Sequence, residues 1–216
     1  MRIAILVFDR LTALDAIGPY EVLSRLPDAE LEFVAAKPGM VRTDTDLLAL
    51  EAGRSIAEVT APDVVVVPGG EGNRPLLHDH PVLDWLRSIH RGTRYTTSVC
   101  TGSLVLGAAG ILEGLRATSH WAYVEHLAGF GATPVSERVV EDGKVITAAG
   151  VSSGIDMALH LAAKLAGTEV AKGIQLAIEY DPAPPFDSGS PQKAPDHLVD
   201  TLRSLEDFSD LPAPTS

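Results

Sequence analysis

The chain has 216 residues, of which 45% are hydrophobic, so it can bury a substantial core, and its length suits one domain. Its 29 acidic residues outnumber its 17 basic ones and give a net charge of −12. No cluster of lysine and arginine is visible that would follow a phosphate backbone, which disfavours nucleic acid as a partner. The apolar N-terminus is too short for a signal peptide and no run approaches membrane-spanning length, so we expect a cytoplasmic protein that does not bind membranes.

The first half of the chain alternates predicted strands and helices. The apolar run from Arg2 to Phe8 predicts a buried first strand, and the segment after it leads into a helix that ends near Leu26. The weak alternation from Val41 to Leu50 predicts an edge hairpin or an excursion from the sheet. Further strands are expected at Leu31 to Ala36 and Val64 to Val67, and a helix at Pro81 to His90.

The second half continues this alternation. Strands are expected at Tyr95 to Val99, Val135 to Val140 and Val145 to Ala148, and helices at Ser103 to Ala109, Trp121 to Phe130, Ser153 to Ala166 and Glu169 to Ile178. Such alternation predicts an α/β fold with a doubly wound, mostly parallel sheet covered by helices on both faces.

The C-terminal part differs in composition from the rest. The prolines and glycines of Asp181 to Pro191 exclude regular structure there. We therefore expect a single α/β domain over residues 1–191, and a segment over residues 192–216 with a helix near Pro195 to Leu205 and a frayed end.

Cys100 lies where the strand at Tyr95 to Val99 turns directly into a helix. Such a turn strains the residue at the joint and holds its side chain out at the carboxyl edge of the sheet, as in a nucleophile elbow. The free amides of the new helix, beginning with Thr101, would stabilise negative charge on the sulfur, so a lowered thiol pKa is expected. The alternative is that Cys100, the single cysteine of the chain, is a small buried hydrophobic residue.

Asp15 also falls just beyond the carboxyl end of a predicted strand. In a doubly wound sheet, two such positions on neighbouring strands converge on one crevice, where ligands bind. A carboxyl group within reach of the Cys100 thiol would share a proton with it. The alternative is that Asp15 only caps the helix that follows.

The glycine-rich loop Pro68 to Gly72 follows the strand at Val64 to Val67. It lacks the lysine and hydroxyl residue of a P-loop and the spacing of a dinucleotide fingerprint. Because glycine allows close approach of the backbone, the amides of Gly70 and Thr101 could act as a pair of hydrogen-bond donors. A plain tight turn explains the loop equally well.

The seven histidines do not form a metal-binding pattern. His78 and His80 lie two apart in an expected loop without a third ligand nearby, and His160 is expected to face an apolar helical stretch. A metal site is therefore not expected. His120 either points toward Cys100 or is a buried structural histidine, which is the interpretation we favour.

Four motifs together resemble the ThiJ/PfpI superfamily, which has the class I glutamine-amidotransferase-like, flavodoxin-like fold. They are Val64 to Gly70 (VVVVPGG), Ser98 to Gly110 (SVCTGSLVLGAAG), Arg116 to Tyr123 (RATSHWAY) and Gly150 to Asp156 (GVSSGID). Within the superfamily, the elbow motif, the Asp15 segment before Gly18-Pro19 and the Tyr180 to Pro191 tail are most similar to isocyanide hydratases. The similarity runs from Arg2 to about Pro191.

This resemblance implies a hydro-lyase that adds water to an organic isocyanide and yields an N-substituted formamide. It implies a small-molecule substrate, no metal or organic cofactor, and a homodimer. By position, the catalytic residues would be Cys100 as nucleophile, Asp15 as general acid and base, and Thr101, with Gly70, Gly150 and Val151 lining the substrate site.

Two positions depart from the pattern expected of isocyanide hydratases. Ala149 stands where glycine is expected and Ser119 where threonine is common, which leaves the accepted substrate size open. The alternatives are a non-enzymatic sensor that works by oxidation of Cys100, and an aldehyde-processing relative of the glyoxalase or deglycase type. Thr101 after the cysteine, in place of histidine, and Asp15, in place of glutamate, disfavour aldehyde-processing enzymes and PfpI-type proteases.

Overall fold

The computed structural model describes residues 1–206, 208–209 and 211–213. The helices are α1 (Ala13–Leu23), α2 (Asn73–Leu76), α3 (His80–His90), α4 (Gly102–Ala108), the 3-10 helix η1 (Val124–Phe130), α5 (Ser153–Ala166), α6 (Thr168–Ala177) and α7 (Asp196–Ser204). The strands are β1 (Arg2–Leu6), β2 (Glu30–Ala35), β3 (Gly39–Arg42), β4 (Ala49–Ala52), β5 (Arg54–Ser55), β6 (Val64–Val67), β7 (Tyr95–Val99), β8 (Arg116–Ala117), β9 (Thr133–Pro134), β10 (Val139–Asp142) and β11 (Val145–Ala148).

A seven-stranded sheet in the order β10-β11-β7-β6-β1-β2-β5 forms the centre of the molecule. All neighbouring strands in it are parallel except β10 and β11. Val99 of β7 pairs with Ala148 of β11, and Ser98 pairs with Val67 of β6, so the carboxyl ends of these three strands meet at one edge. The predicted α/β fold with a doubly wound, mostly parallel sheet is confirmed.

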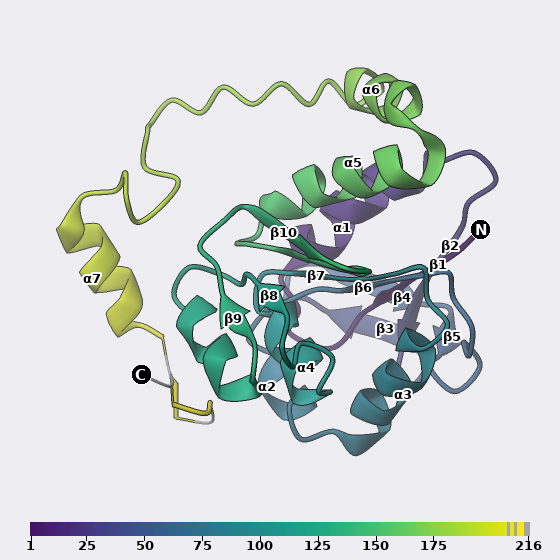
Figure 1. Cartoon of the computed structure of the whole chain (residues 1–216), viewed down its shortest axis with the longest axis horizontal. Helices are drawn as coiled ribbons and strands as arrows, with labels where there is room; N and C mark the ends of the chain where they lie inside the picture. The colour runs from purple at the N-terminus through teal and green to yellow at the C-terminus, as the bar shows by residue number, and fades with distance from the viewer. Residues whose placement is uncertain (207, 210, 214–216) are drawn as a thin grey trace.

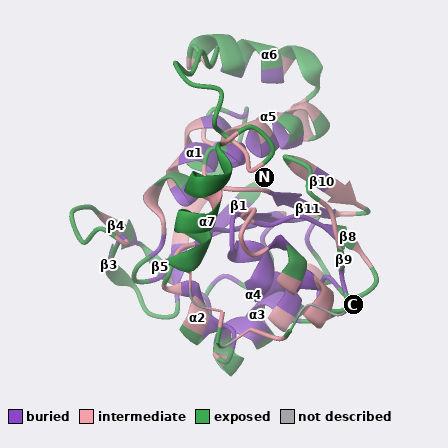
Figure 2. Ribbon diagram, turned by 90° about the vertical axis from the view of Figure 1, so that its left-hand side faces the viewer, coloured by how far each residue is buried: buried purple, intermediate pink, exposed green. Residues whose placement is uncertain are grey.

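Helices cover both faces of this sheet (Figure 1). The helices α1 and α5 pack together on one face, and α3 and α4 pack on the other. All four valines of β6 are buried, as a continuous apolar run in a parallel strand predicts. Figure 2 shows the buried core as the central strands and the inner sides of these helices. The predicted excursion after β2 is the antiparallel hairpin of β3 and β4, which forms a separate small sheet.

Two predicted elements differ in the structure. The helix expected at Trp121 to Phe130 is a 3-10 helix that begins only at Val124. Before it, the Ala122 amide donates to the His120 ring, and this local bond replaces a helical one. The strand expected from Val135 begins at Val139, because the Val135 amide instead donates to the Ala117 carbonyl, in line with β8.

The C-terminal part leaves the body of the protein as an extended segment (Figure 1). Residues 181–189 are exposed and have no helix or strand, and α7 buries none of its residues, as Figure 2 also shows. The irregular stretch and the last helix are thus found where the sequence predicts them. The frayed end was expected from Leu211 onward, and its last residues, 214–216, lie outside the described residues.

Across the part of the chain that the structure describes, no helix is both long enough and apolar enough to cross a membrane.

Gly102 allows the close packing of the elbow on its neighbouring strand. A Cβ atom at Gly102 would lie 2.0 Å from the Val67 carbonyl oxygen, so Gly102→Ala should lower the free energy of unfolding by roughly 2 kcal/mol or more. The matched control is Gly173→Ala in α6, where no atom lies within 4 Å of the added Cβ. The free energy of unfolding of that variant, measured by urea denaturation, should rise by about 0.5–1 kcal/mol. Equal stability of the two variants would contradict the packing argument.

Candidate active site

The turn between β7 and α4 places Cys100 at the carboxyl edge of the sheet. Cys100 has a φ of +57°, a strained value for a residue with a side chain. Its amide donates to the carbonyls of Ala148 and Ala149, and its own carbonyl accepts from the hydroxyls of Ser103 and Ser119 at 3.1 Å each. The strained backbone is therefore held by hydrogen bonds from both sides, as a nucleophile elbow requires.

Hydrogen-bond donors surround the Cys100 sulfur. The backbone amides of Thr101 and Val151 and the Thr101 hydroxyl donate to it, and each of these bonds favours the thiolate. The Gly70 amide does not reach the sulfur directly. It donates to the Thr101 hydroxyl oxygen at 3.1 Å and so orients that hydroxyl. The two amides at the sulfur are those of Thr101 and Val151, whereas Gly70, the predicted partner of Thr101, lies behind the Thr101 side chain.

Asp15 lies in the first turn of α1 and is completely buried. It does not cap the helix, because its Oδ2 atom accepts from the Gly69 amide at 2.9 Å. Gly69 permits this approach, since a Cβ there would lie 2.5 Å from the Thr101 hydroxyl oxygen and 3.0 Å from Asp15 Oδ2. The Asp15 carboxyl group interacts with the Cys100 thiol, although its second oxygen, Oδ1, receives no well-aligned hydrogen bond. One carboxylate oxygen thus remains available for a proton.

Burial sets the ionisation of this pair. It raises the pKa of Asp15 from its ordinary value of 3.8 to about 7, and hydrogen bonds from Gly69 and Cys100 offset only part of the rise. Burial and the nearby Asp15 charge raise the pKa of the Cys100 thiol above its ordinary value. The expected lowering of the thiol pKa is therefore wrong. The amide donors favour the thiolate, but desolvation and the carboxylate outweigh them.

These opposed effects leave both groups protonated below about pH 7 and leave the pair with one proton above it, because the thiol ionises only at higher pH. Two negative charges side by side in a buried site repel each other strongly, so ionisation of Asp15 keeps the proton on Cys100. A thiolate forms when Asp15 holds the proton instead. The site can therefore pass one proton between sulfur and oxygen without changing its net charge.

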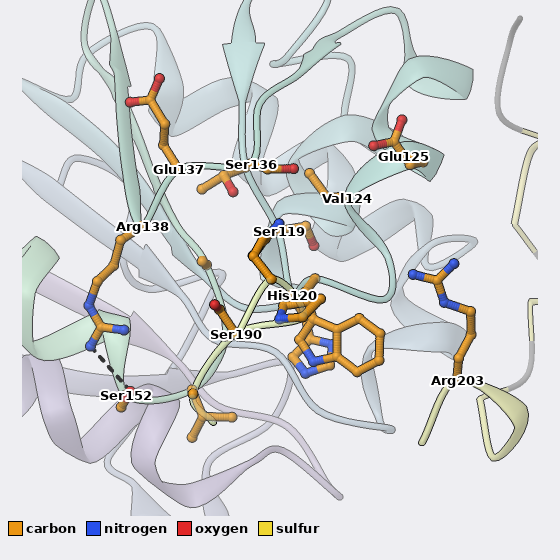
Figure 3. Close-up of a pocket in the computed structure, with 18 residues that line it drawn as sticks. Ser119, His120, Val124, Glu125, Ser136, Glu137, Arg138, Ser152, Ser190 and Arg203 are labelled. Atoms are coloured by element: carbon orange, nitrogen blue, oxygen red, sulfur yellow. Dashed lines mark hydrogen bonds between the residues drawn. The ribbon is translucent and has the colours of Figure 1, made fainter. Parts of the chain in front are cut away.

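A cavity of about 620 Å³ lies next to the elbow. It is lined by residues 118–121, 124–125, 136–138, 149–152, 189–192 and 203. Figure 3 shows Arg138 and Ser152 on one side of it and Arg203 on the other. Gly150 and Val151 line this cavity, whereas Cys100 and Asp15 are not among its lining residues. Cys100 is 6% exposed, so only a narrow group can reach the sulfur.

Two cavity residues, Ser119 and Val151, and Asn73 outside the cavity hold the elbow in place. Ser119 is singled out in the sequence only as a departure from a pattern, yet its hydroxyl donates to the Cys100 carbonyl. No sequence pattern indicates Asn73, whose side-chain amide donates to the Thr101 carbonyl at 2.9 Å. Val151 was expected to bound the pocket, but its amide also donates to the sulfur. No local sequence pattern predicts these contacts, because each joins segments that are far apart in the chain.

The histidines take different places from those expected. His120 is half-buried, lines the cavity and packs on Gly150. Burial lowers the pKa of its ring, so the ring is neutral. His160 does not face an apolar stretch. It is exposed, and its Nε2 atom lies 2.7 Å from a Glu141 carboxylate oxygen. Among the described residues, no three His, Cys, Asp or Glu side chains lie close enough to hold a metal ion.

A mostly parallel α/β sheet with a cysteine at a nucleophile elbow and a buried carboxyl group beside it defines the class of this protein. The model of the DJ-1/PfpI family matches residues 1–164, and the chain belongs to this family. The predicted membership of the ThiJ/PfpI superfamily is confirmed.

Similar proteins come from several bacteria. An isonitrile hydratase from Pseudomonas putida is 48% identical over 203 residues, which cover 94% of this chain and 89% of that protein. The crystal structure of a ThiJ/PfpI family protein from Pseudomonas syringae matches with a TM-score of 0.92 and 39% identity, over 94% of this chain and 85% of that one. The HTH-type transcriptional regulator CdhR of Pseudomonas aeruginosa is 37% identical over 46% of this chain and 31% of its own length.

Proposed function

We propose that this protein catalyses the addition of water to an organic isocyanide, which yields an N-substituted formamide. The observation that carries the proposal is the buried pair of Cys100 and Asp15, whose side chains interact with each other. The 48% identity to a protein named isonitrile hydratase supports the same reaction. An isocyano group is linear and only two atoms long, so it suits a cysteine that is only 6% exposed.

In the first step, the Cys100 sulfur bonds to the terminal carbon of the isocyanide. As that bond forms, the thiol proton passes to Asp15, whose raised pKa suits it to hold a proton near neutral pH. The attacked carbon becomes negatively charged, and Asp15 returns the proton to it. The product is a thioimidate in which the former isocyanide carbon is bonded to sulfur, hydrogen and nitrogen.

In the second step, water hydrolyses the thioimidate. The Asp15 carboxylate takes a proton from water while the water oxygen bonds to the thioimidate carbon, and the proton goes on to the nitrogen. The carbon–sulfur bond then breaks, and sulfur leaves with the hydroxyl proton. This releases the formamide and restores the thiol, so the net reaction consumes one isocyanide and one water.

The amides of Thr101 and Val151 stabilise charge on the sulfur in both steps. Gly70 acts through the Thr101 hydroxyl, and Gly150 and Val151 bound the space for the substrate. The proposal further includes a cytoplasmic homodimer with a single catalytic domain over residues 1–191, followed by a segment over residues 192–216. Sedimentation of the purified chain tests the dimer.

The experiment that tests the function is incubation of the purified protein with isopropyl isocyanide. We expect N-isopropylformamide to accumulate by proton NMR over many turnovers per protein molecule. Absence of formamide from isopropyl and aryl isocyanides alike would overturn the proposal. Turnover of an α-oxoaldehyde in the same assay would indicate the aldehyde-processing alternative, and oxidation of Cys100 without any turnover would indicate the sensor.

The Thr101 hydroxyl offers a test of the donors at the sulfur. Thr101→Val keeps the shape of the side chain but removes the bond to sulfur and the acceptor for the Gly70 amide. We expect kcat to fall by roughly 10- to 100-fold, since a lost charge-stabilising donor typically costs that or more. KM should change by less than about threefold, because Thr101 does not line the cavity. An unchanged kcat would contradict a role for this hydroxyl.

A further inference from the structure

The cavity beside the elbow is built from two separate parts of the chain. Most of it comes from residues 118–152, which lie inside the region that the family model matches. One wall comes from Gly189 to Gln192 and from Arg203 of α7, which lie beyond residue 164, where that match ends. The C-terminal segment therefore shapes the space near Cys100 although it lies outside the family region.

The contacts that hold this segment gather around the cavity. The Arg203 guanidinium lies 5.5 Å from the centre of the Trp121 ring, a cation–π contact. Glu206 accepts from the Tyr123 hydroxyl, and Phe208 stacks on His126. Because α7 buries none of its own residues, a role as a plain structural support for the fold does not explain this arrangement.

The cavity and the thiol share one wall. Val151 lines the cavity, and its amide donates to the Cys100 sulfur. Ala149 and Ser119 also line it and hydrogen-bond to the backbone of Cys100. The cavity is therefore adjacent to Cys100, with Val151 in contact with both.

The cavity lining combines polar side chains with apolar and aromatic ones. Trp121, His120, Val124 and Pro191 contribute to it. Of its four charged side chains, Arg138 pairs with Asp156, Glu137 pairs with Arg116, Arg203 lies over the Trp121 ring, and Glu125 is exposed. The flat rings of Trp121 and His120 in this lining suit a flat aromatic group.

We propose that this cavity binds the N-substituent of the substrate, that the substrate is an isocyanide with a bulky aromatic substituent, and that Trp121 and Arg203 determine this specificity. The inference rests on the proposed function. A volume of about 620 Å³ is within the range of pockets that enclose whole ligands and far exceeds what a small alkyl group fills. An aromatic group would displace water from it and stack beside Trp121.

The test compares 2-naphthyl isocyanide with isopropyl isocyanide in the full-length protein. We expect wild-type protein to favour the naphthyl substrate by at least about tenfold in kcat/KM. In Trp121→Ala this preference should fall about tenfold, chiefly through KM for the naphthyl substrate, and in Arg203→Ala about threefold. The matched control is Asp200→Ala on the same helix, an exposed residue outside the cavity, which should keep the wild-type preference.

The outcomes separate this inference from the proposed function. Turnover of isopropyl isocyanide without a preference for the naphthyl substrate would overturn the inference and leave the function in place. Absence of turnover with both substrates would overturn the function. Arg203 is exposed, so its variant should fold, and an unchanged preference in both Arg203→Ala and Trp121→Ala would exclude these two residues from recognition.

Discussion

Replacement of Cys100 by alanine is expected to abolish formamide production while the protein remains folded. The proposed reaction needs a sulfur that bonds to the isocyanide carbon, and Cys100 is the single cysteine of the chain. Turnover should fall below detection, by roughly 10⁴-fold or more, because the covalent route is lost entirely. The measurement is formamide accumulation by proton NMR, with circular dichroism as the check on folding.

Cys100→Ser is the matched control for this variant. It keeps a hydrogen-bonding atom at the elbow, but the hydroxyl ionises far less readily than a thiol, so activity should remain close to that of Cys100→Ala. Both replacements meet the same backbone strain at a φ of +57°. Formamide production by Cys100→Ala at the wild-type rate would eliminate the covalent mechanism.

The central strands and the elbow are predictable from the sequence because their signals are local. A run such as Val64 to Val67 has few alternatives to a buried strand, and the abrupt change at Cys100 from β-branched residues to helix formers specifies a sharp turn. The same reasoning predicts that Asp15 and Cys100 converge, since both follow parallel strands.

The ionisation of the site and the shape of the cavity are not predictable in this way. The thiol pKa depends on how much water the surrounding fold excludes. The amides around Cys100 lower this pKa, whereas burial raises it by more. The cavity wall joins Trp121 to Arg203, 82 positions later, through a long irregular segment. No periodicity relates such segments, so only the folded chain brings them together.

Replacement of Asp15 by asparagine is expected to reduce kcat by roughly 10²- to 10⁴-fold, the usual contribution of a positioned acid and base. The amide has nearly the same shape, but it neither takes the thiol proton nor returns it to the isocyanide carbon. KM should change little, because Asp15 is not among the residues that line the cavity. Formamide production should be followed under saturating isocyanide, and a kcat within threefold of wild type would show that the proton moves by another path.

The stability of Asp15→Asn should rise relative to wild type as the pH increases. In wild type the pKa of Asp15 is about 7 in the folded protein, against 3.8 as its ordinary value, so the folded state binds more protons than the unfolded state between these pH values. Stability therefore falls as pH rises through this window, by on the order of 4 kcal/mol from this group. Asparagine has no such titration. Urea denaturation at pH 4.5 and pH 8 should show that the free energy of unfolding of the variant rises relative to wild type at the higher pH. If the difference between the two proteins is the same at both pH values, Asp15 is already ionised at low pH and does not act as the proton carrier.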